Sequence, residues 1–496
     1  MAVDEALEVA AGVARPPTAR FAVGLAAATA LGAWLGVERA GVGTVPLGLA
    51  LAAGAAALAS RRTTLVWLAA GLLASSLAQR SMAGLEGPMA TGAVQAEVTL
   101  LTDPVPLGSG AVRVEAGLAG RRWSATAHGA AAAALDDRLA GERVVVRGRR
   151  LPPGSYERRL RHRHLVGRLQ VDTVLGWQPG HGVTRAANRL RRTLERGAAS
   201  LPDRQRSLLM GLTIGDDRHQ PADLTDAFRA AGLGHLSAVS GQNVAVLLTA
   251  AAPALRRLRL ASRLVLTMAL LAGFTLVTRG EPSVLRATAM AAVGAFAAAT
   301  GRPSTSLRTL GLAVTGLLLC DPLLVGSLGF QLSVAATAGI VVGAAVIERR
   351  LPGPRLIRLP LAMTIAAQLA VAPLLVATFG PLSLASLPAN VLAIPLAGPV
   401  MVWGLTGGMV AGLAGEPAAA LLQLPTRVLL AWIEAVALAA ARWPLGTVGV
   451  PQVALAAVAV LLAEASCVVG RPSARRALRL AALLGGWAVL VSAVAG

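Results

Sequence analysis

Apolar residues fill most of this chain in blocks of roughly 15–20 residues, and short breaks rich in Arg, Pro and Gly separate the blocks. A helix needs about 20 apolar residues to cross the hydrocarbon core of a membrane. The pattern therefore predicts a polytopic α-helical integral membrane protein. The blocks lie at 21–37, 45–59, 64–79, 235–254, 261–278, 282–300, 306–320, 328–347, 360–378, 382–396, 398–413, 417–441, 453–469 and 478–494.

The pattern changes between residues 94 and 177, where short stretches alternate or carry runs of valine, and Gly and Pro separate them. Such stretches predict β-strands, and several of them in so short a region predict a small β-barrel. We expect an OB-like barrel, a fold that often binds single-stranded nucleic acid. The stretches are 94–100, 112–116, 143–149 and 169–174.

Residues 183–199 are expected to form an amphipathic helix, a kind of helix that is able to lie in the membrane interface. A second helix is expected at 203–214. The apolar stripe of the first helix is Val183, Ala187, Leu190 and Leu194, whereas Arg185, Arg189, Arg192 and Arg196 lie off that stripe.

Four regions follow from these patterns. We expect N-terminal transmembrane helices at 1–90 and an extracytoplasmic β domain at 91–180. Amphipathic or interfacial helices follow at 181–230, and a multi-helix transmembrane domain occupies 231–496.

The arginines between the blocks test the orientation of the helices. If the chain enters the membrane from outside at residues 231–244, the arginines at 256–259, 302–308 and 349–358 all fall in the cytoplasm, as the positive-inside rule requires. Between residues 382 and 413, however, the predicted blocks contain one membrane crossing too many for the later arginines to fall in the cytoplasm as well. Because block 382–396 contains Pro and Asn, and interrupted helices at membrane depth line cavities, we expect this block to be re-entrant or broken.

Charge adds one feature to this picture. The chain has 496 residues, is 14% charged and carries a net charge of +21, with no lysine. One arginine-dense region lies outside the membrane blocks, and it is either a phosphate-attracting surface or a solvated basic face without a ligand. Stacking aromatics in this region are few, so any grip on nucleic acid is expected to be electrostatic. The arginines are Arg143, Arg147, Arg149, Arg150, Arg158, Arg159, Arg161 and Arg163.

Polar residues are rare in the apolar blocks, and they concentrate in the stretch 231–244. Buried polar groups in a membrane either join helices or line a wet path, and both interpretations stay open for each residue taken singly. Ser237, Ser240 and Gly241 are expected to share a helix face. Arg286 either faces a cavity or extends to the interface. The candidate channel-lining residues are His235, Ser237, Ser240, Gly241, Asn243, Arg286, Gln331, Ser333, Gln368 and Asn390.

We expect no metal site, no cofactor and no catalytic residue. His162 and His164 form a His-x-His pair, but no acid follows it. Asp216 and Asp217 either bind a cation or, more simply, form a turn. Cys320 and the second cysteine, Cys467, lie far apart in apolar segments, so neither a disulfide framework nor a metal site is indicated.

Several ordered motifs resemble the ComEC family, the inner-membrane channels of bacterial DNA uptake. The run Ala-Phe-Arg-Ala-Ala-Gly-Leu-Gly-His-Leu-Ser-Ala-Val-Ser-Gly at 227–241 is similar to the family signature. Pro-Ser-Val-Leu-Arg-Ala at 282–287 and Gly-Phe-Gln-Leu-Ser at 329–333 follow in the family's order. The strong part of the resemblance covers residues 201–400.

This resemblance implies a channel in the bacterial inner membrane that passes single-stranded DNA into the cytoplasm. It also implies a DNA receptor on the outer side, membrane lipid around the helices, and a cytosolic ATP-driven motor, because no nucleotide-binding loop is present. The family usually has a His where this chain has Asn243. Many members end in a metallo-β-lactamase-like domain, which we do not expect here, so degradation of the other strand would need a separate nuclease.

Two other functions compete with the channel. One is a secondary transporter of another anionic or small-molecule substrate, with its site at the expected broken helix. The other is an intramembrane hydrolase that uses Ser240 and His235, which we disfavour because the two lie five residues apart and no suitable acid is near.

Overall fold

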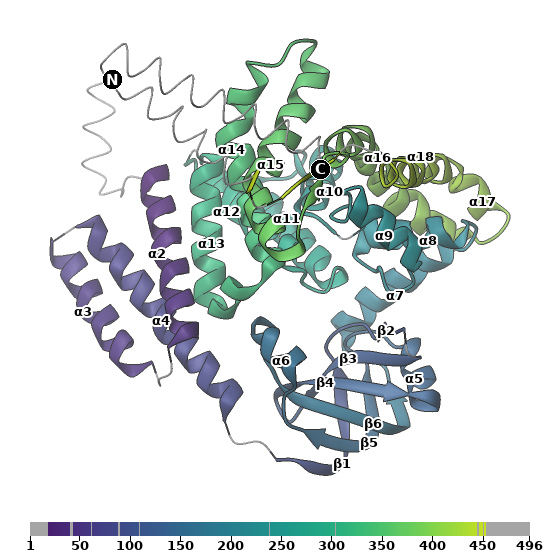
Figure 1. The fold of residues 1–496 in the computed structure, drawn as a ribbon, viewed down its shortest axis with the longest axis horizontal. Helices are drawn as coiled ribbons and strands as arrows, with labels where there is room; N and C mark the ends of the chain where they lie inside the picture. The colour runs from purple at the N-terminus through teal and green to yellow at the C-terminus, as the bar shows by residue number, and fades with distance from the viewer. Residues whose placement is uncertain are drawn as a thin grey trace. The chain divides into compact units, whose positions relative to one another are not determined.

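The structure is a computed structural model (Figure 1). It describes residues 18–39, 43–60, 62–87, 90–108, 110–237, 239–302, 304–443, 446–449 and 451–452. The blocks 453–469 and 478–494, and with them Cys467, lie outside the described residues. The chain divides into two compact units, and each is described by itself. Unit 1 takes residues up to 87, 256–268 and 289–326, and unit 2 takes 88–255, 269–288 and the residues from 327 onward.

The prediction of a polytopic membrane protein is confirmed. In the described part of the chain, six helices are long and apolar enough to cross a membrane. They are α2 (Ala19–Glu38), α11 (Leu260–Val277), α12 (Pro282–Ala299), α14 (Leu328–Glu348), α15 (Arg355–Phe379) and α16 (Ser386–Ala414). Shorter apolar helices are α3 (Thr44–Ser60), α10 (Gly241–Leu255) and α13 (Ser306–Cys320).

Unit 1 packs α2 against α4 (Thr63–Glu86) and α13. Gly32 of α2 lies directly on the backbone of Gly71 in α4, where a side chain would collide with the Gly71 carbonyl. Trp67 of α4 donates its indole N–H to the Phe21 carbonyl at 3.2 Å. Small residues at such crossings let helix backbones approach closely, which is how helices associate in membranes.

The β domain of unit 2 holds the expected strands. The four expected stretches are β1 (Gly92–Leu100), β3 (Ala111–Leu118), β5 (Arg143–Leu151) and β6 (Leu165–Gln178). The sheet also contains β2 (Val105–Pro106) and β4 (Arg121–His128), which were not predicted. The strands pair in the order β1-β5-β6-β4-β3-β2, and β1 also pairs with β3 through Thr99 and Leu100. The pairing therefore returns to the strand where it began. All pairs are antiparallel except β4 with β6.

Alternation along β5 explains how this domain packs. Val144 and Val146 are buried, whereas Arg147 and Arg149 on the opposite face are exposed. The short helix α5 (Gly129–Asp136) between β4 and β5 places Leu135 in the interior. Val144 and Val146 of β5 thus face the interior of the domain, and Arg147 and Arg149 face solvent.

The helical part of unit 2 gathers around one buried apolar cluster that includes Leu209, Phe228, Ala389 and Ile433. Its further elements are α7 (Gly182–Gly197), α8 (Asp203–Ile214), α9 (Ala222–Ala230), α17 (Ala418–Leu422) and α18 (Leu424–Ala440). The short helix α6 (Ser155–Arg159) lies between β5 and β6 and belongs to the β domain. Two short strands, β7 (Leu382–Ser383) and β8 (Thr447–Val448), pair with each other.

The expected amphipathic helix at 183–199 is α7, and its apolar stripe is buried toward its C-terminal end. Leu194 is fully buried against Gly408 of α16, and Gly197 lies against the backbone of Gly408 and Gly412. Only at the start of the stripe is an apolar side chain exposed, that of Val183. Most of the apolar stripe is therefore packed on protein, and the place of this helix in the membrane interface stays a prediction.

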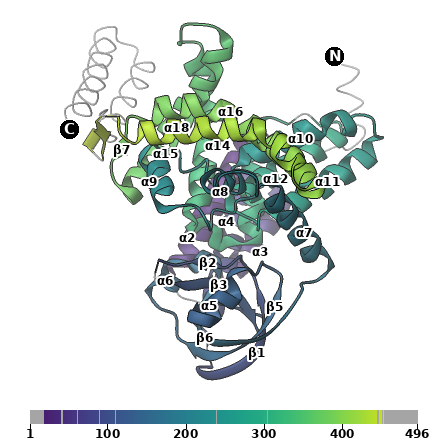
Figure 2. The same ribbon diagram turned by 90° about the vertical axis from the view of Figure 1, so that its right-hand side faces the viewer.

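The expected break at 382–396 is wrong. Residues 386–396 of the first block and the whole of block 398–413 belong to the single helix α16, which continues through Pro395 and Pro399, while residues 382 and 383 form β7 before it. Figure 2 shows α16 running beside α18, and Trp432 of α18 donates to the Leu392 carbonyl at 3.1 Å. Neighbouring helices support backbone groups that a proline leaves exposed, which allows the helix to continue. One helix in place of two also removes the extra crossing in the predicted alternation.

Candidate functional site

The stretch 231–244 is only partly helical. The described residues before Gly241 form turns, and α10 begins at Gly241. Ser237 and Ser240 therefore precede the helix, so the prediction that they share a helix face with Gly241 is wrong. Gly232 adopts a left-handed backbone with φ +66° and lies against Ser386 of α16, where a Cβ would collide. Close approach to α16 thus explains why the chain leaves helical geometry here.

Arg286 of α12 reaches this stretch. Its side chain is buried, and its Nε donates to the Ser333 hydroxyl of α14 at 2.7 Å. The guanidinium also lies against Gly241, where any Cβ would overlap it. Burial excludes the alternative in which Arg286 extends to a surface. We call Ser240, Gly241, Asn243, Arg286 and Ser333 the Gly241 group.

Hydrogen bonds tie this group to the neighbouring backbone. Asn243 donates to the Leu212 carbonyl at the end of α8 at 2.6 Å and accepts from the Ser240 hydroxyl at 3.4 Å. Ser283, at the start of α12, donates to the Val239 carbonyl at 2.8 Å. The polar residues of the Gly241 group therefore join α8, α10, α12 and α14.

A second set of polar residues lies on the other side of the same stretch. Asn390 of α16 donates to the carbonyls of Ser386 and Gly232 at 2.7 and 3.4 Å, and Gln368 of α15 donates to the Ser386 hydroxyl at 3.4 Å. Asn390 is 2% exposed, and its Oδ1 has no hydrogen-bond partner among the described residues. The two donor contacts fix which end of the amide is oxygen. We call Gly232, Gln368, Ser386 and Asn390 the Asn390 group.

The structure thus brings together seven of the ten predicted channel residues, in two groups that share the stretch 231–244. His235 and Ser237 are not in either group; His235 is exposed, and Ser237 donates to the nearby Gly234 carbonyl. Gln331 lies on α14, half-buried, two residues before Ser333. Sequence reasoning missed Ser386, which accepts from Gln368 through its hydroxyl and from Asn390 through its carbonyl, and Ser283, which ties α12 to the Val239 carbonyl.

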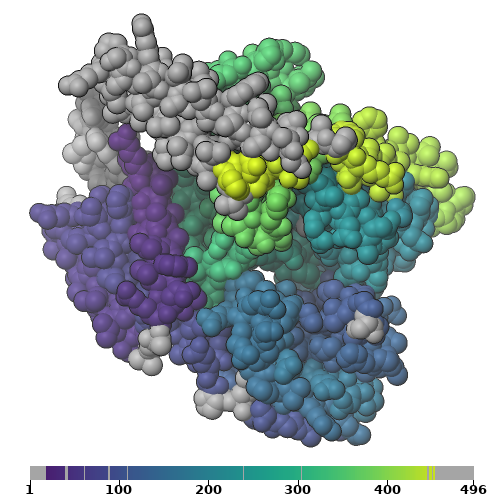
Figure 3. All heavy atoms as spheres, viewed as in Figure 1, coloured from purple at the N-terminus to yellow at the C-terminus, as the bar shows by residue number. Residues whose placement is uncertain are grey.

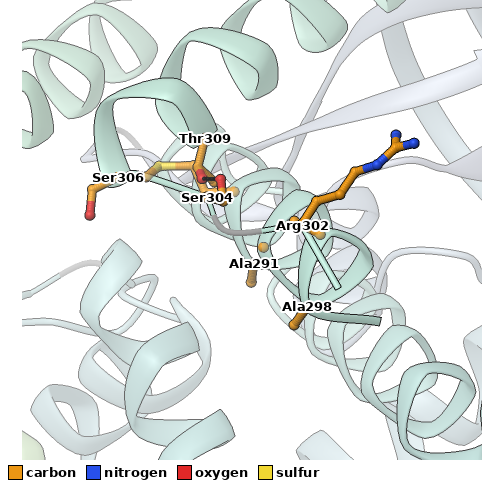
Figure 4. Close-up of a pocket in the computed structure, with 9 residues that line it drawn as sticks. Ala291, Ala298, Arg302, Ser304, Ser306 and Thr309 are labelled. Atoms are coloured by element: carbon orange, nitrogen blue, oxygen red, sulfur yellow. Dashed lines mark hydrogen bonds between the residues drawn. The ribbon is translucent and has the colours of Figure 1, made fainter. Parts of the chain in front are cut away.

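A pocket of about 440 Å³ lies in unit 1, between the end of α12 and the start of α13 (Figure 4). Small residues such as Ala291 and Ala298 line it, and Ser304 and Thr309 share a hydrogen bond of 2.6 Å. Arg302 extends away from these hydroxyls (Figure 4). None of the ten predicted channel residues lines this pocket.

The arginine-dense region divides into exposed and engaged side chains. Arg163 forms an ion pair of 2.6 Å with Glu115, and Arg143 pairs with Glu97 at 3.1 Å. Arg150 is half-buried. Exposed arginines of the region are Arg147, Arg149, Arg158, Arg159 and Arg161. The three aromatic side chains of this region offer little surface on which bases could stack. Trp123 is buried, and arginine guanidiniums already lie over the rings of Tyr156 and Trp177.

A buried charged cluster, absent from the predictions, joins the β domain to the helices. Arg191 of α7 donates to Asp103 and Asp216, each at 2.8 Å, and to the Val277 carbonyl at 2.7 Å. Its side chain is 3% exposed. Arg279 holds Asp103 in a two-bond contact, and Arg218 holds Asp216 likewise. We call Asn188 and these five charged residues the Arg191 cluster.

The sequence did contain a signal for this cluster. Arg191 lies four residues after Ala187 and three before Leu194, so it falls on the apolar stripe of α7. The acids at 216 and 217 were interpreted as a turn or a cation site, but Asp216 is occupied by two arginines. A charged residue on an apolar stripe indicates a buried partner, although its identity requires the fold.

Electrostatics keep both aspartates of the cluster ionised. Burial alone would raise the pKa of Asp103, but Arg191 and Arg279 outweigh burial and lower it below 3.8. Burial likewise opposes ionisation of Asp216, yet hydrogen bonds and attraction from Arg218, with Arg191, hold its pKa well below the ordinary range. Glu115 behaves in the opposite way, because burial outweighs Arg163 and raises its pKa above 4.5.

Comparison with known proteins decides the family. A family profile described as competence protein matches residues 212–474, which is more than half of the chain. The chain belongs to the competence protein family. The resemblance to ComEC proteins is thereby confirmed.

A curated relative supports the same assignment. The ComE operon protein 3 of Bacillus subtilis (strain 168) is 26% identical over 197 residues, which are 39% of this chain and 25% of the relative. The matched segment therefore spans a quarter of that protein's length. No solved structure matches the chain.

Some of the predicted residues lie inside the region that matches the competence protein family, and others lie before it. Both the Gly241 group and the Asn390 group lie within 212–474, and so does Asp216. The basic residues of the β domain, together with Asp103 and Arg191, precede the matched region. The contact between Arg191 and Asp216 therefore joins the family region to the segment that comes before it.

Proposed function

We propose that this protein is a channel of the bacterial inner membrane that passes single-stranded DNA into the cytoplasm during DNA uptake. Family membership supports a role in competence. The observation that carries the proposal is the convergence of neutral amides and hydroxyls from α10, α12, α14, α15 and α16 on the stretch 231–244.

The chemistry of these groups suits a strand of phosphates. Each nucleotide carries a negative charge, so a path that conducts it must be polar without holding it tightly at one place. Most groups at the stretch are neutral, and Arg286 adds a single guanidinium. The partnerless Oδ1 of Asn390 adds an acceptor whose desolvation costs about 1–3 kcal/mol unless water or a base N–H reaches it. Both features are ones that a hydrated path for a phosphate strand requires.

We further propose that the β domain is an OB-like barrel on the outer side of the membrane, where it gathers DNA. The closed order of strand pairing, with one parallel pair among antiparallel ones, supports this fold. The exposed arginines of β5 and the following loop supply the charge. Attraction of this kind weakens steeply with salt.

The proposal assigns no chemical step to this chain. A DNA receptor on the outer side, a cytosolic ATP-driven motor and a separate nuclease would supply delivery, pulling force and removal of the other strand. A secondary transporter is the competing function, but the broken helix on which it depended is the continuous α16.

The proposed channel is tested by measuring import of labelled DNA into a bacterial strain that lacks its own competence channel and expresses this protein. Arg286→Ala and Asn390→Leu are expected to abolish import while the protein stays at normal abundance. Arg302→Ala, an exposed arginine just beyond the same helix, is the matched control and is expected to import DNA normally.

Two outcomes would contradict the channel. Full import by both Arg286→Ala and Asn390→Leu would remove these residues from the path. Saturable uptake of a metabolite by the purified chain in liposomes, without salt-sensitive binding of single-stranded DNA, would favour the transporter.

A further inference from the structure

The Arg191 cluster connects four segments of the chain. Asp103 lies in the loop between β1 and β2, Arg191 lies on α7, and Asp216 and Arg279 follow α8 and α11. Figure 3 shows the atoms of the β domain meeting those of the helices that follow it. The cluster is the buried, charged part of this meeting.

The contacts fix direction as well as distance. Both nitrogens of Arg279 hold the two oxygens of Asp103 at 3.0 and 2.8 Å. Asn188 accepts from Arg279 at 2.9 Å and donates to the Ala140 carbonyl of the β domain at 3.1 Å, while Asp103 accepts from the Ala140 N–H at 2.8 Å. Two-bond contacts between guanidinium and carboxylate tolerate little rotation.

Charge makes the arrangement selective. Buried ion pairs add little stability compared with apolar packing, but they are unfavourable in any arrangement that separates the partners. A β domain that tilted would leave Asp103 or Arg191 buried without its counter-charge. These contacts therefore favour the orientation of the β domain in which every charge of the cluster keeps its partner.

We propose that the Arg191 cluster locks the β domain in one orientation over the helices that carry the Gly241 group, so that Arg191 is a positioning residue for DNA entry. This inference rests on the proposed function, because it concerns how a strand gathered on the β domain is aligned with the path. Two carbonyls near the end of α8 connect the cluster to the Gly241 group. The Leu212 carbonyl accepts from Asn243, and the Ile214 carbonyl, two residues later, accepts from Arg191. The same end of α8 thus meets both the cluster and the Gly241 group.

Distances between spin labels test the lock directly. Labels at Asp172→Cys, on the exposed face of β6, and Leu421→Cys, on α17, report the position of the β domain once Cys320 and Cys467 are replaced by Ser. The parent protein in nanodiscs is expected to give one narrow distance distribution in double electron–electron resonance. Arg191→Met and Asn188→Ala are expected to broaden it.

A matched control separates buried from exposed charge. Arg192 lies next to Arg191 on α7 and also pairs with the β domain, through Glu142, but its side chain is 45% exposed. Arg192→Gln is expected to keep the narrow distribution. If Arg191→Met fails to fold, Asn188→Ala still tests the lock, because it removes no charge.

Function is measured in parallel. Arg191→Met and Asn188→Ala are expected to lower DNA import at least tenfold at equal abundance, while the purified variants bind single-stranded DNA as the parent does. Distributions as narrow in both variants as in the parent would overturn the lock. Failure of the parent itself to import DNA would instead overturn the proposed function, and the distance measurement would still decide the inference.

Discussion

Two buried polar regions of unit 2 follow different rules. The Arg191 cluster contains three guanidiniums and two carboxylates in direct contact, and it lies outside the six candidate membrane helices. The Gly241 and Asn390 groups belong largely to those helices and consist of amides and hydroxyls, with Arg286 as their charged member.

The difference follows from solvation. Charges buried near the edge of a membrane protein are tolerable when each finds a partner, whereas charges at membrane depth are costly and rare. The charged region is therefore suited to holding parts of the protein in place. The neutral region is suited to contact with a passing ligand, because it exerts no strong attraction.

Removal of one charge from the Arg191 cluster is the largest effect expected from this comparison. Arg191→Met leaves Asp103 and Asp216 close together without their shared cation. The expected loss is about 3–5 kcal/mol of unfolding free energy, because breaking a buried ion pair leaves an uncompensated charge. Thermal unfolding in detergent micelles measures it, and an unchanged midpoint would show that the cluster is not buried in the membrane-embedded protein.

The pH dependence of Asp103 distinguishes its role from that of Glu115. A carboxyl whose pKa is lowered by folding stabilises the protein above its unfolded pKa, and this stabilisation is lost as the pH falls through the folded value. Asp103→Asn is therefore expected to destabilise the protein at pH 7 and progressively less below about pH 4. Unfolding midpoints measured from pH 3 to pH 7 follow this difference.

Glu115→Gln is expected to affect stability at pH 7 differently from Asp103→Asn. Because burial raises the pKa of Glu115, the folded protein favours the protonated carboxyl, and the neutral amide is expected to cost no stability at pH 7. Equal losses at pH 7 in Asp103→Asn and Glu115→Gln would contradict the assigned pKa directions.

Within the neutral region a smaller effect on stability is expected. Ser333→Ala removes the hydroxyl that accepts from Arg286 and is expected to cost about 1–3 kcal/mol, the usual range for a buried bond to a charged group. Ser237→Ala, an exposed hydroxyl, should change stability by less than about 0.5 kcal/mol. If the two variants unfold at the same temperature, Ser333 is not the acceptor of Arg286.

The smallest effect is expected for Arg192→Gln. Its side chain is 45% exposed and screened by solvent, and the buried Glu142 keeps the hydrogen bond that the Trp177 indole donates at 2.7 Å, so loss of the ion pair is expected to cost no more than about 1 kcal/mol. A loss as large as that of Arg191→Met would show that exposure does not separate the two pairs.

Helices and strands were largely predictable, because period and block length depend on local sequence. The blocks at 21–37, 45–59 and 64–79 correspond to α2, α3 and α4, and the strand-like stretches correspond to β1, β3, β5 and β6. The prediction for 382–413 was wrong because it assumed that Pro395 would break the helix. Helices packed around α16 allow it to continue through this proline. The glycine at 232 bends the chain before Gly241, and no period records this.

Sequence alone determined that the chain crosses a membrane, that a β domain interrupts its helices and that it belongs with competence proteins, because hydrophobic period, length and ordered motifs are properties of the chain itself. Only the tertiary structure decided that Arg191 meets Asp103, Asp216 and the Val277 carbonyl, and that Asn390 and Arg286 reach one stretch. The physical reason is that a buried polar group is satisfied by whichever partner the fold brings to it, and those partners lie 158 residues apart for Asn390 and Gly232 and 176 apart for Arg279 and Asp103.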